Sequence, residues 1–161
     1  MGKNPKLSVG DQAPTFELES DTEGTVSLED LRGNRVILYF YPKDMTPGCT
    51  TQACDFRDNI DEFEERGYNI YGVSPDPVDS HQKFRKEHDL NFPLLADTQK
   101  DVARAYGVWR EKTVYGKTTT GIVRSTFIID EEGVIEEIQD NVRATGHVDR
   151  LLRDLTPAPA S

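Results

Sequence analysis

Two hydrophobic patterns follow one another in the first half of the chain. Residues 36–41 (VILYFY) are apolar without interruption, which is typical of a central strand buried on both faces. From residue 49 to residue 66 the apolar positions recur at steps of three and four, which predicts a helix with one apolar face. The residues of that face are Ala53, Phe56, Ile60 and Phe63. A buried strand therefore leads, through a loop rich in turn formers, into an amphipathic helix.

The rest of the chain alternates between strand and helix patterns. Short strands are predicted near Phe16, Leu18 and Val26 and at 69–73, 92–95, 125–130 and 134–138, a helix start at 27–30, and helices at 79–88, 101–106 and 146–155. This order is typical of an α/β protein built around one sheet. It predicts a thioredoxin-like fold, with a central mixed β-sheet flanked by helices and an N-terminal β extension.

Length and charge limit the possible functions. The 161 residues fit a single domain without repeat or linker, ordered from about residue 9 to residue 155, with flexible ends at 1–5 and 156–161. The net charge of -10 argues against nucleic acid and against an anionic membrane surface as partners, since both attract Lys and Arg. The chain shows no apolar run near the roughly 20 residues of a membrane span and no secretory signal pattern, so we expect a cytoplasmic protein.

The chain has two cysteines, Cys49 and Cys54, five positions apart. A structural disulfide between them would close a very small loop and stabilise little. In a cytoplasmic protein such a pair is more typical of catalysis or metal binding. A zinc site is disfavoured because there is no second cysteine pair. The histidines His81, His88 and His147, interpreted as surface or structural residues, have no metal-ligand spacing either. No nucleotide or flavin motif is visible, so no cofactor is expected.

Cys49 occupies a position suited to nucleophilic chemistry. It follows the central strand and falls in the first turn of the predicted helix, where unpaired N–H groups favour a thiolate. At pH 7, full ionisation of an ordinary thiol raises the reactive thiolate fraction only about 30-fold. A fast enzyme therefore also needs hydrogen-bond donors that stabilise the charge on the leaving group. Thr46 and the backbone amide of Gly48 lie close enough in sequence, and an arginine from elsewhere would add a permanent charge.

The same stretch carries a family resemblance. Pro42-x-x-x-Thr46-x-x-Cys49 matches the active-site signature of peroxiredoxins. The longer run TPGCTTQACDFRD (46–58) resembles the Q-type branch, also called bacterioferritin comigratory protein. Three further segments fit that branch: Gly107-Val-Trp109, Tyr115-Gly-Lys117 and residues 121–127 (GIVRSTF). The resemblance runs from about Val9 to Leu155.

The resemblance implies a role for each site residue. Cys49 would be the peroxidatic nucleophile and Cys54 the resolving cysteine, joined in an intramolecular disulfide. Thr46 would hydrogen-bond the sulfur and the peroxide, Arg124 would stabilise the thiolate and polarise the peroxide, and Pro42 would shield the sulfur. The implied activity is reduction of hydrogen peroxide and organic hydroperoxides by a monomer without metal or cofactor, recycled by thioredoxin or a similar dithiol protein. This reaction requires that a peroxide can reach the sulfur.

Two details refine this picture. Gln52 stands where many other peroxiredoxins have Glu, and Gln is usual in the Q-type branch. On an ideal helix the Cα atoms of Cys49 and Cys54 would be about 8.6 Å apart. A disulfide requires about 7 Å or less. We therefore expect the first turns of the helix to unwind after oxidation.

Other interpretations stay open. The alternative interpretation of Cys54 is a core residue, of Arg124 a surface ion-pair partner, of Thr46 a helix cap and of Pro42 the end of the strand. At the level of function, the alternative is a redox sensor that switches partner binding through the same disulfide. A protein disulfide oxidoreductase would usually have C-x-x-C, and a holdase chaperone would not need Cys49.

Overall fold

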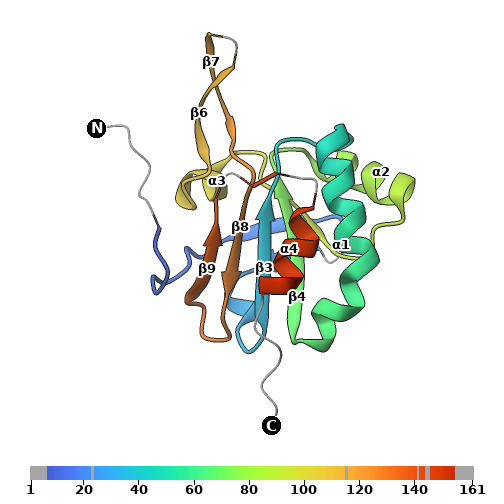
Figure 1. Ribbon diagram of the computed structural model, residues 1–161, viewed down its shortest axis with the longest axis vertical. Coiled ribbons are helices and arrows are strands. Elements are labelled where there is room, and N and C mark those ends of the chain that lie inside the picture. Colours follow the sequence, from blue (N-terminus) through green and yellow to red (C-terminus); the bar gives the residue numbers. More distant parts are fainter. Residues whose placement is uncertain (1–6, 23, 115, 141, 144–145, 155–161) are drawn as a thin grey trace.

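The computed structural model describes residues 7–22, 24–114, 116–140, 142–143 and 146–154 (Figure 1). In chain order the elements are β1 (Glu17–Ser20), β2 (Thr25–Ser27), the 3-10 helix η1 (Glu29–Leu31), β3 (Arg35–Phe40), α1 (Pro47–Glu65), β4 (Tyr68–Ser74), α2 (Val78–His88), β5 (Leu94–Ala96), α3 (Asp101–Ala105), β6 (Trp109–Val114), β7 (Lys117–Ile122), β8 (Ser125–Ile129), β9 (Ile135–Gln139) and α4 (His147–Asp154). No helix in these described segments is long and apolar enough to cross a membrane.

Seven strands form one mixed sheet in the order β2-β1-β5-β4-β3-β8-β9. β3, β4 and β5 are parallel, and antiparallel strands continue the sheet on both sides. The central position of β3 explains its unbroken apolar sequence, because its alternate side chains enter two different cores. Val36, Leu38 and Phe40 belong to one core, and Ile37 and Tyr39 to the other. The predicted strand buried on both faces is confirmed.

Helices cover both faces of this sheet. The core on the Tyr39 side contains residues of α1, α2 and α4, which gather beside β3 and β4 in Figure 1. The opposite core contains Val102 and Ala103 of α3 together with residues of the N-terminal strands. The predicted α1 face is confirmed, since Ala53, Phe56, Ile60 and Phe63 are all buried. Phe56 stacks on Tyr39, with ring centroids 4.6 Å apart. The sheet and helix α1 therefore form one packed unit at the position that carries Cys49.

The hairpin of β6 and β7 was not predicted from the sequence. It forms a separate two-stranded ribbon that projects from the body at the top of Figure 1. Residues 116–120 are exposed, so they lack the alternation of apolar and polar side chains that marks a half-buried strand. The predicted helix start at 27–30 is only a turn of 3-10 helix. The predicted flexible ends, and Leu155 as an inward residue of the last helix, lie outside the described residues.

Gly72 of β4 shows how tightly this core is packed. A Cβ atom at this position would lie 2.9 Å from the Tyr39 ring and hydroxyl and 3.0 Å from Leu94 Cδ2. Because the Tyr39 ring is buried between other aromatic rings, it has no free space to move into. We expect Gly72→Ala to lower the free energy of unfolding by about 1–3 kcal/mol, measured by urea denaturation.

The Tyr39 hydroxyl offers a matched control. It is buried without a hydrogen-bond partner in the described structure. Tyr39→Phe should therefore be close to neutral, and adding it to Gly72→Ala should restore part of the lost stability. Equal stability of Gly72→Ala and the wild type would contradict this description of the core.

Candidate active site

The candidate nucleophile lies where the chain leaves the sheet and enters α1. Thr46 is the N-cap residue of α1 and has an extended backbone, and Pro47 is the first helical residue. The first helical hydrogen bond runs from the Thr50 amide to the Thr46 carbonyl, 2.9 Å. The amides of Gly48 and Cys49 therefore belong to the first turn, which has no acceptors within the helix. These N–H groups and the helix dipole favour negative charge on the Cys49 sulfur.

Arg124 approaches this sulfur from a distant part of the chain. Its Nη2 lies 3.4 Å from Cys49 Sγ. The sheet explains this proximity, because Ser125 pairs with Phe40 at the end of β3. Arg124 precedes Ser125 and so stands beside the point where β3 gives way to the Cys49 loop. Its backbone carbonyl accepts a hydrogen bond from the Val142 amide, 2.9 Å, which holds the chain at this position.

Gln52 orients the guanidinium from the next turn of α1. Its Oε1 accepts a hydrogen bond from Arg124 Nη1, 2.7 Å, while Nη2 faces the sulfur. Gln52 is fully buried, and its Nε2 has no hydrogen-bond partner within the described structure. A carboxylate at this position would compensate the charge of Arg124. The neutral amide of Gln52 orients the guanidinium without neutralising it, so the positive charge of Arg124 acts on Cys49.

Thr46 occupies the predicted position with a different hydrogen bond. It stands at the N-cap, but its hydroxyl makes no capping hydrogen bond. Instead Oγ1 donates to the Lys43 carbonyl, 2.9 Å. With its hydrogen used there, the hydroxyl can only accept, so it is suited to receive an O–H from a peroxide. Thr46 therefore occupies the N-cap position that the cap interpretation predicts, but its side chain does not make the capping hydrogen bond. Pro42 follows Tyr41 and is half-buried, and its shielding role stays a prediction.

The two cysteines are free thiols in very different surroundings. Cys49 is 2% exposed and packs in the core between α1 and the sheet, whereas Cys54 is half-buried. The sulfur is thus more enclosed than a first-turn position suggests, water is nearly excluded from it, and the expected open access for a peroxide is not seen in this conformation. Because α1 is continuous from Pro47 to Glu65, both cysteines are held in helical geometry. In this conformation the pair is too far apart for a disulfide.

His147, interpreted from the sequence as surface or structural, is a buried neighbour of this site. It is 1% exposed, and its Nε2 lies 3.0 Å from the Thr126 hydroxyl on β8. Burial, together with the charges of Arg150 and Arg124, lowers the pKa of His147 to about 4. His147 is therefore neutral at pH 7. No local pattern identifies it, because its partners come from β8 and from Phe56 of α1.

The lowered pKa of His147 predicts a pH-dependent stability. The unfolded chain binds a proton at His147 near pH 6.5, but the folded protein resists it until about pH 4. Stability from this residue is therefore complete above about pH 6.5 and is lost as the pH falls towards 4. Between about pH 7.5 and about pH 5 we expect wild type to lose about 2 kcal/mol more than His147→Gln, measured by urea denaturation. Equal losses in the two proteins would contradict this protonation state.

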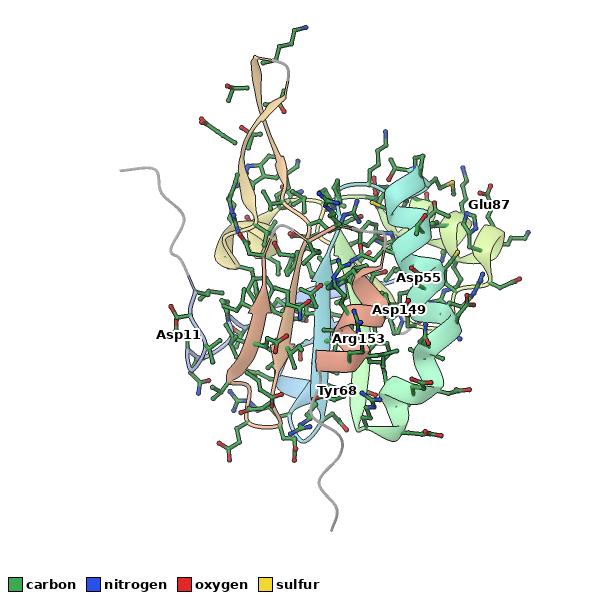
Figure 2. All side chains as sticks on the ribbon, viewed as in Figure 1. Asp11, Asp55, Tyr68, Glu87, Asp149 and Arg153 are labelled. Atoms are coloured by element: carbon green, nitrogen blue, oxygen red, sulfur yellow. The ribbon has the colours of Figure 1, made fainter. Side chains whose placement is uncertain are left out.

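A pair of acidic residues lies next to Cys54. Asp55 of α1 and Asp149 of α4 are labelled close together on neighbouring helices in Figure 2. Burial raises the pKa of Asp55, and the charges of Asp149 and Asp58 raise it further. The repulsion between these carboxylates is relieved if α1 moves away from α4. The repulsion between Asp55 and Asp149 therefore acts against the packing of this part of α1 on α4.

The chain matches the AhpC/TSA family over residues 9–138. It is 51% identical to a putative peroxiredoxin of Mycobacterium tuberculosis (strain CDC 1551 / Oshkosh) over 156 residues, which are 97% of this chain and 99% of that protein. It is 47% identical to peroxiredoxin Bcp of Bacillus subtilis (strain 168), covering 92% of this chain and 95% of that one. The chain belongs to the AhpC/TSA family. As a peroxiredoxin of this family it is a thiol-dependent peroxidase.

Solved structures of AhpC/TSA proteins agree with the fold. A cysteine-to-serine mutant of Xylella fastidiosa PrxQ superposes with a TM-score of 0.86 at 33% identity, covering 92% of this chain and 95% of that one. Bacterioferritin comigratory protein of Xanthomonas campestris gives a TM-score of 0.81 at 38% identity, covering 86% and 88%. The predicted thioredoxin-like fold and the resemblance to Q-type peroxiredoxins are both confirmed.

Proposed function

We propose that Cys49 is the peroxidatic nucleophile of this peroxidase and that Cys54 resolves its oxidised form. The observation that carries the proposal is the guanidinium of Arg124, 3.4 Å from Cys49 Sγ at the start of α1. A cation and the helix N-terminus act together on one sulfur, which is the environment of reactive cysteines. The near exclusion of water strengthens both interactions.

The proposed first step is attack of the Cys49 thiolate on one oxygen of the peroxide. The O–O bond breaks, the sulfur is oxidised to a sulfenic acid, and the other oxygen leaves as hydroxide or alkoxide, which takes up the proton that the Cys49 thiol released and becomes water or an alcohol. Arg124 stabilises the charge on the leaving oxygen, and Thr46 accepts the peroxide O–H. The Gly48 amide is a second donor. The Xanthomonas campestris relative was described for alkyl peroxide reduction, so we include organic hydroperoxides with hydrogen peroxide as substrates.

The second step joins the two cysteines. The Cys54 thiol attacks the sulfenic acid, a disulfide forms, and water leaves. This step requires the first turns of α1 to unwind, because the continuous helix keeps the cysteines apart. Two features lower the cost of unwinding: the unpaired Gln52 Nε2 and the repulsion between Asp55 and Asp149. An external dithiol protein such as thioredoxin then reduces the disulfide and is itself oxidised to one.

Intact mass spectrometry tests this cycle. After one equivalent of hydrogen peroxide the wild type should lose roughly two hydrogens, and Cys54→Ser should gain roughly one oxygen. Cys49→Ser, the control, should keep its mass. A wild type that instead gains one stable oxygen would remove Cys54 from the resolving role.

Turnover separates the enzyme from the alternative redox sensor. With thioredoxin, thioredoxin reductase and NADPH, an enzyme consumes many equivalents of peroxide per Cys49. A sensor would oxidise once and stop, even though its disulfide is the same. We expect sustained turnover. A single equivalent consumed in the presence of excess active reductant would contradict thioredoxin recycling.

A further inference from the structure

A buried polar cluster lies beneath the loop that leads to Cys49. At its centre is Asp44, which is 4% exposed. Its Oδ1 accepts a hydrogen bond from the Tyr41 hydroxyl, 2.6 Å, and its Oδ2 accepts one from the Ser80 hydroxyl, 2.8 Å. His81 Nδ1 lies 2.7 Å from the same Oδ2. Burial and the charge of Asp44 raise the pKa of Tyr41 well above its usual range, so the phenol keeps its hydrogen and donates it.

His81 links Asp44 to the sheet. The ring is fully buried, and its Nε2 lies 2.9 Å from the Leu95 carbonyl of β5. A carbonyl can only accept, so Nε2 carries a hydrogen. Tyr41 and Ser80 both donate to Asp44, and His81 Nδ1 completes the set of side chains bonded to this carboxyl group. The cluster therefore ties the loop after β3 to α2 and β5.

The backbone of residue 44 is held as firmly as its side chain. The Asp44 amide donates to Asp76 Oδ2, 2.6 Å, and the Ser74 hydroxyl donates to the same oxygen, 3.0 Å. The next residue, Met45, is 39% exposed and has a backbone φ of 64°, a value that residues other than glycine seldom adopt. Such a conformation persists where the neighbouring contacts impose it. Thr46 follows at once as the N-cap residue of α1.

From these contacts we propose that Asp44 and His81 are positioning residues for the peroxidase reaction. They touch no peroxide. They hold the 43–46 segment so that Thr46 keeps its hydrogen bond to Lys43 and presents its free acceptor beside Cys49. The inference rests on the proposed function, because it concerns how peroxide is held at Cys49. It predicts that loosening this cluster lowers reaction with peroxide more than it lowers the general reactivity of the sulfur.

Two reagents distinguish positioning from simple stability. Alkylation by iodoacetamide needs the Cys49 thiolate, whose charge is supported by Arg124 and the helix start. Reaction with hydrogen peroxide also needs Thr46 in place. In Asp44→Asn we expect the peroxide rate to fall roughly 10- to 100-fold and the alkylation rate to stay within about 3-fold, both measured in a Cys54→Ser background under native conditions.

Asp97→Asn is the matched control. Asp97 is 2% exposed, and its side chain accepts hydrogen bonds from the amides of Val102 and Ala103 in α3, with none recorded to residues 43–46 in the described structure. Asp97→Asn also removes a buried carboxylate and its hydrogen bonds. The peroxide rate and the alkylation rate should nevertheless both stay within about 3-fold of the parent protein. Equal peroxide rates in Asp44→Asn and Asp97→Asn, or parallel losses in both reagents for Asp44→Asn, would overturn the inference.

A milder variant keeps the test decisive if Asp44→Asn does not fold. Tyr41→Phe removes one donor to Asp44 and retains the ring. It should lower the peroxide rate roughly 3- to 10-fold with alkylation unchanged. An unchanged peroxide rate in folded Tyr41→Phe would overturn the inference. A parent protein whose Cys49 does not react with peroxide at all would instead contradict the proposed function, so the two failures are distinguishable.

Discussion

Replacing Cys49 with serine should lower peroxide consumption by on the order of a thousandfold or more. A serine hydroxyl is protonated at neutral pH and is a weak nucleophile, and neither Arg124 nor the start of α1 can change that. The measurement is stopped-flow consumption of hydrogen peroxide with thioredoxin as reductant. The fold should survive, because serine is close in size to cysteine.

Cys54→Ser is the matched control for this substitution. It changes the same atoms on the same helix, five residues further along. It should consume one equivalent of peroxide at a rate close to that of the wild type and then stall, or continue only with added small thiols. Substantial turnover by Cys49→Ser would place the chemistry on another residue.

Replacing Arg124 with glutamine should lower the rate of Cys49 oxidation roughly 100- to 1000-fold. The substitution removes the only cation recorded against the sulfur in the described structure, 3.4 Å away, and the hydrogen bond to Gln52. Alkylation of Cys49 at neutral pH should slow as well, because Arg124 stabilises the thiolate. Arg124→Lys should recover part of the rate, since one ammonium group restores charge but cannot fork between the sulfur and Gln52.

Arg110→Gln controls for the loss of a surface arginine. Arg110 pairs with Asp140 at the base of the β6–β7 hairpin and makes no recorded contact with Cys49. Its peroxide rate should stay within about 3-fold of wild type. An Arg124→Gln variant that matches Arg110→Gln would show that the guanidinium near the sulfur has no role in the reaction.

The parts of the fold that the sequence predicts are those with a strong hydrophobic period. β3 is unbroken in its apolar residues because both of its faces are buried, and α1 repeats its apolar residues because one face packs on β3 and β4. Residues 116–120 of the β6–β7 ribbon lack such a pattern because they are exposed. The two strands pair with each other and not with the main sheet, so tertiary burial imposes no alternation on this part.

The candidate site also contains residues that the sequence predicts and residues that only the tertiary structure brings together. Thr46 and Cys49 are close in the chain, so their motif alone brings them together at one helix start. Arg124 is distant, and only the family resemblance pointed to it, since its place depends on the antiparallel register of β8 with β3. The cluster of Asp44 and His81 was missed for the same physical reason. Its bonds join residues on different elements, and no spacing rule along the chain encodes such a contact.

Trapping of the oxidised sulfur tests the central claim most directly. Cys54→Ser is treated with one equivalent of hydrogen peroxide together with a nucleophile that reacts selectively with sulfenic acids, and the digested protein is sequenced by mass spectrometry. Fragment ions should place the adduct on Cys49 and leave the neighbouring Met45 unmodified. Peroxide that is consumed without any adduct on Cys49, or with the oxygen recovered on Met45 instead, would contradict the account.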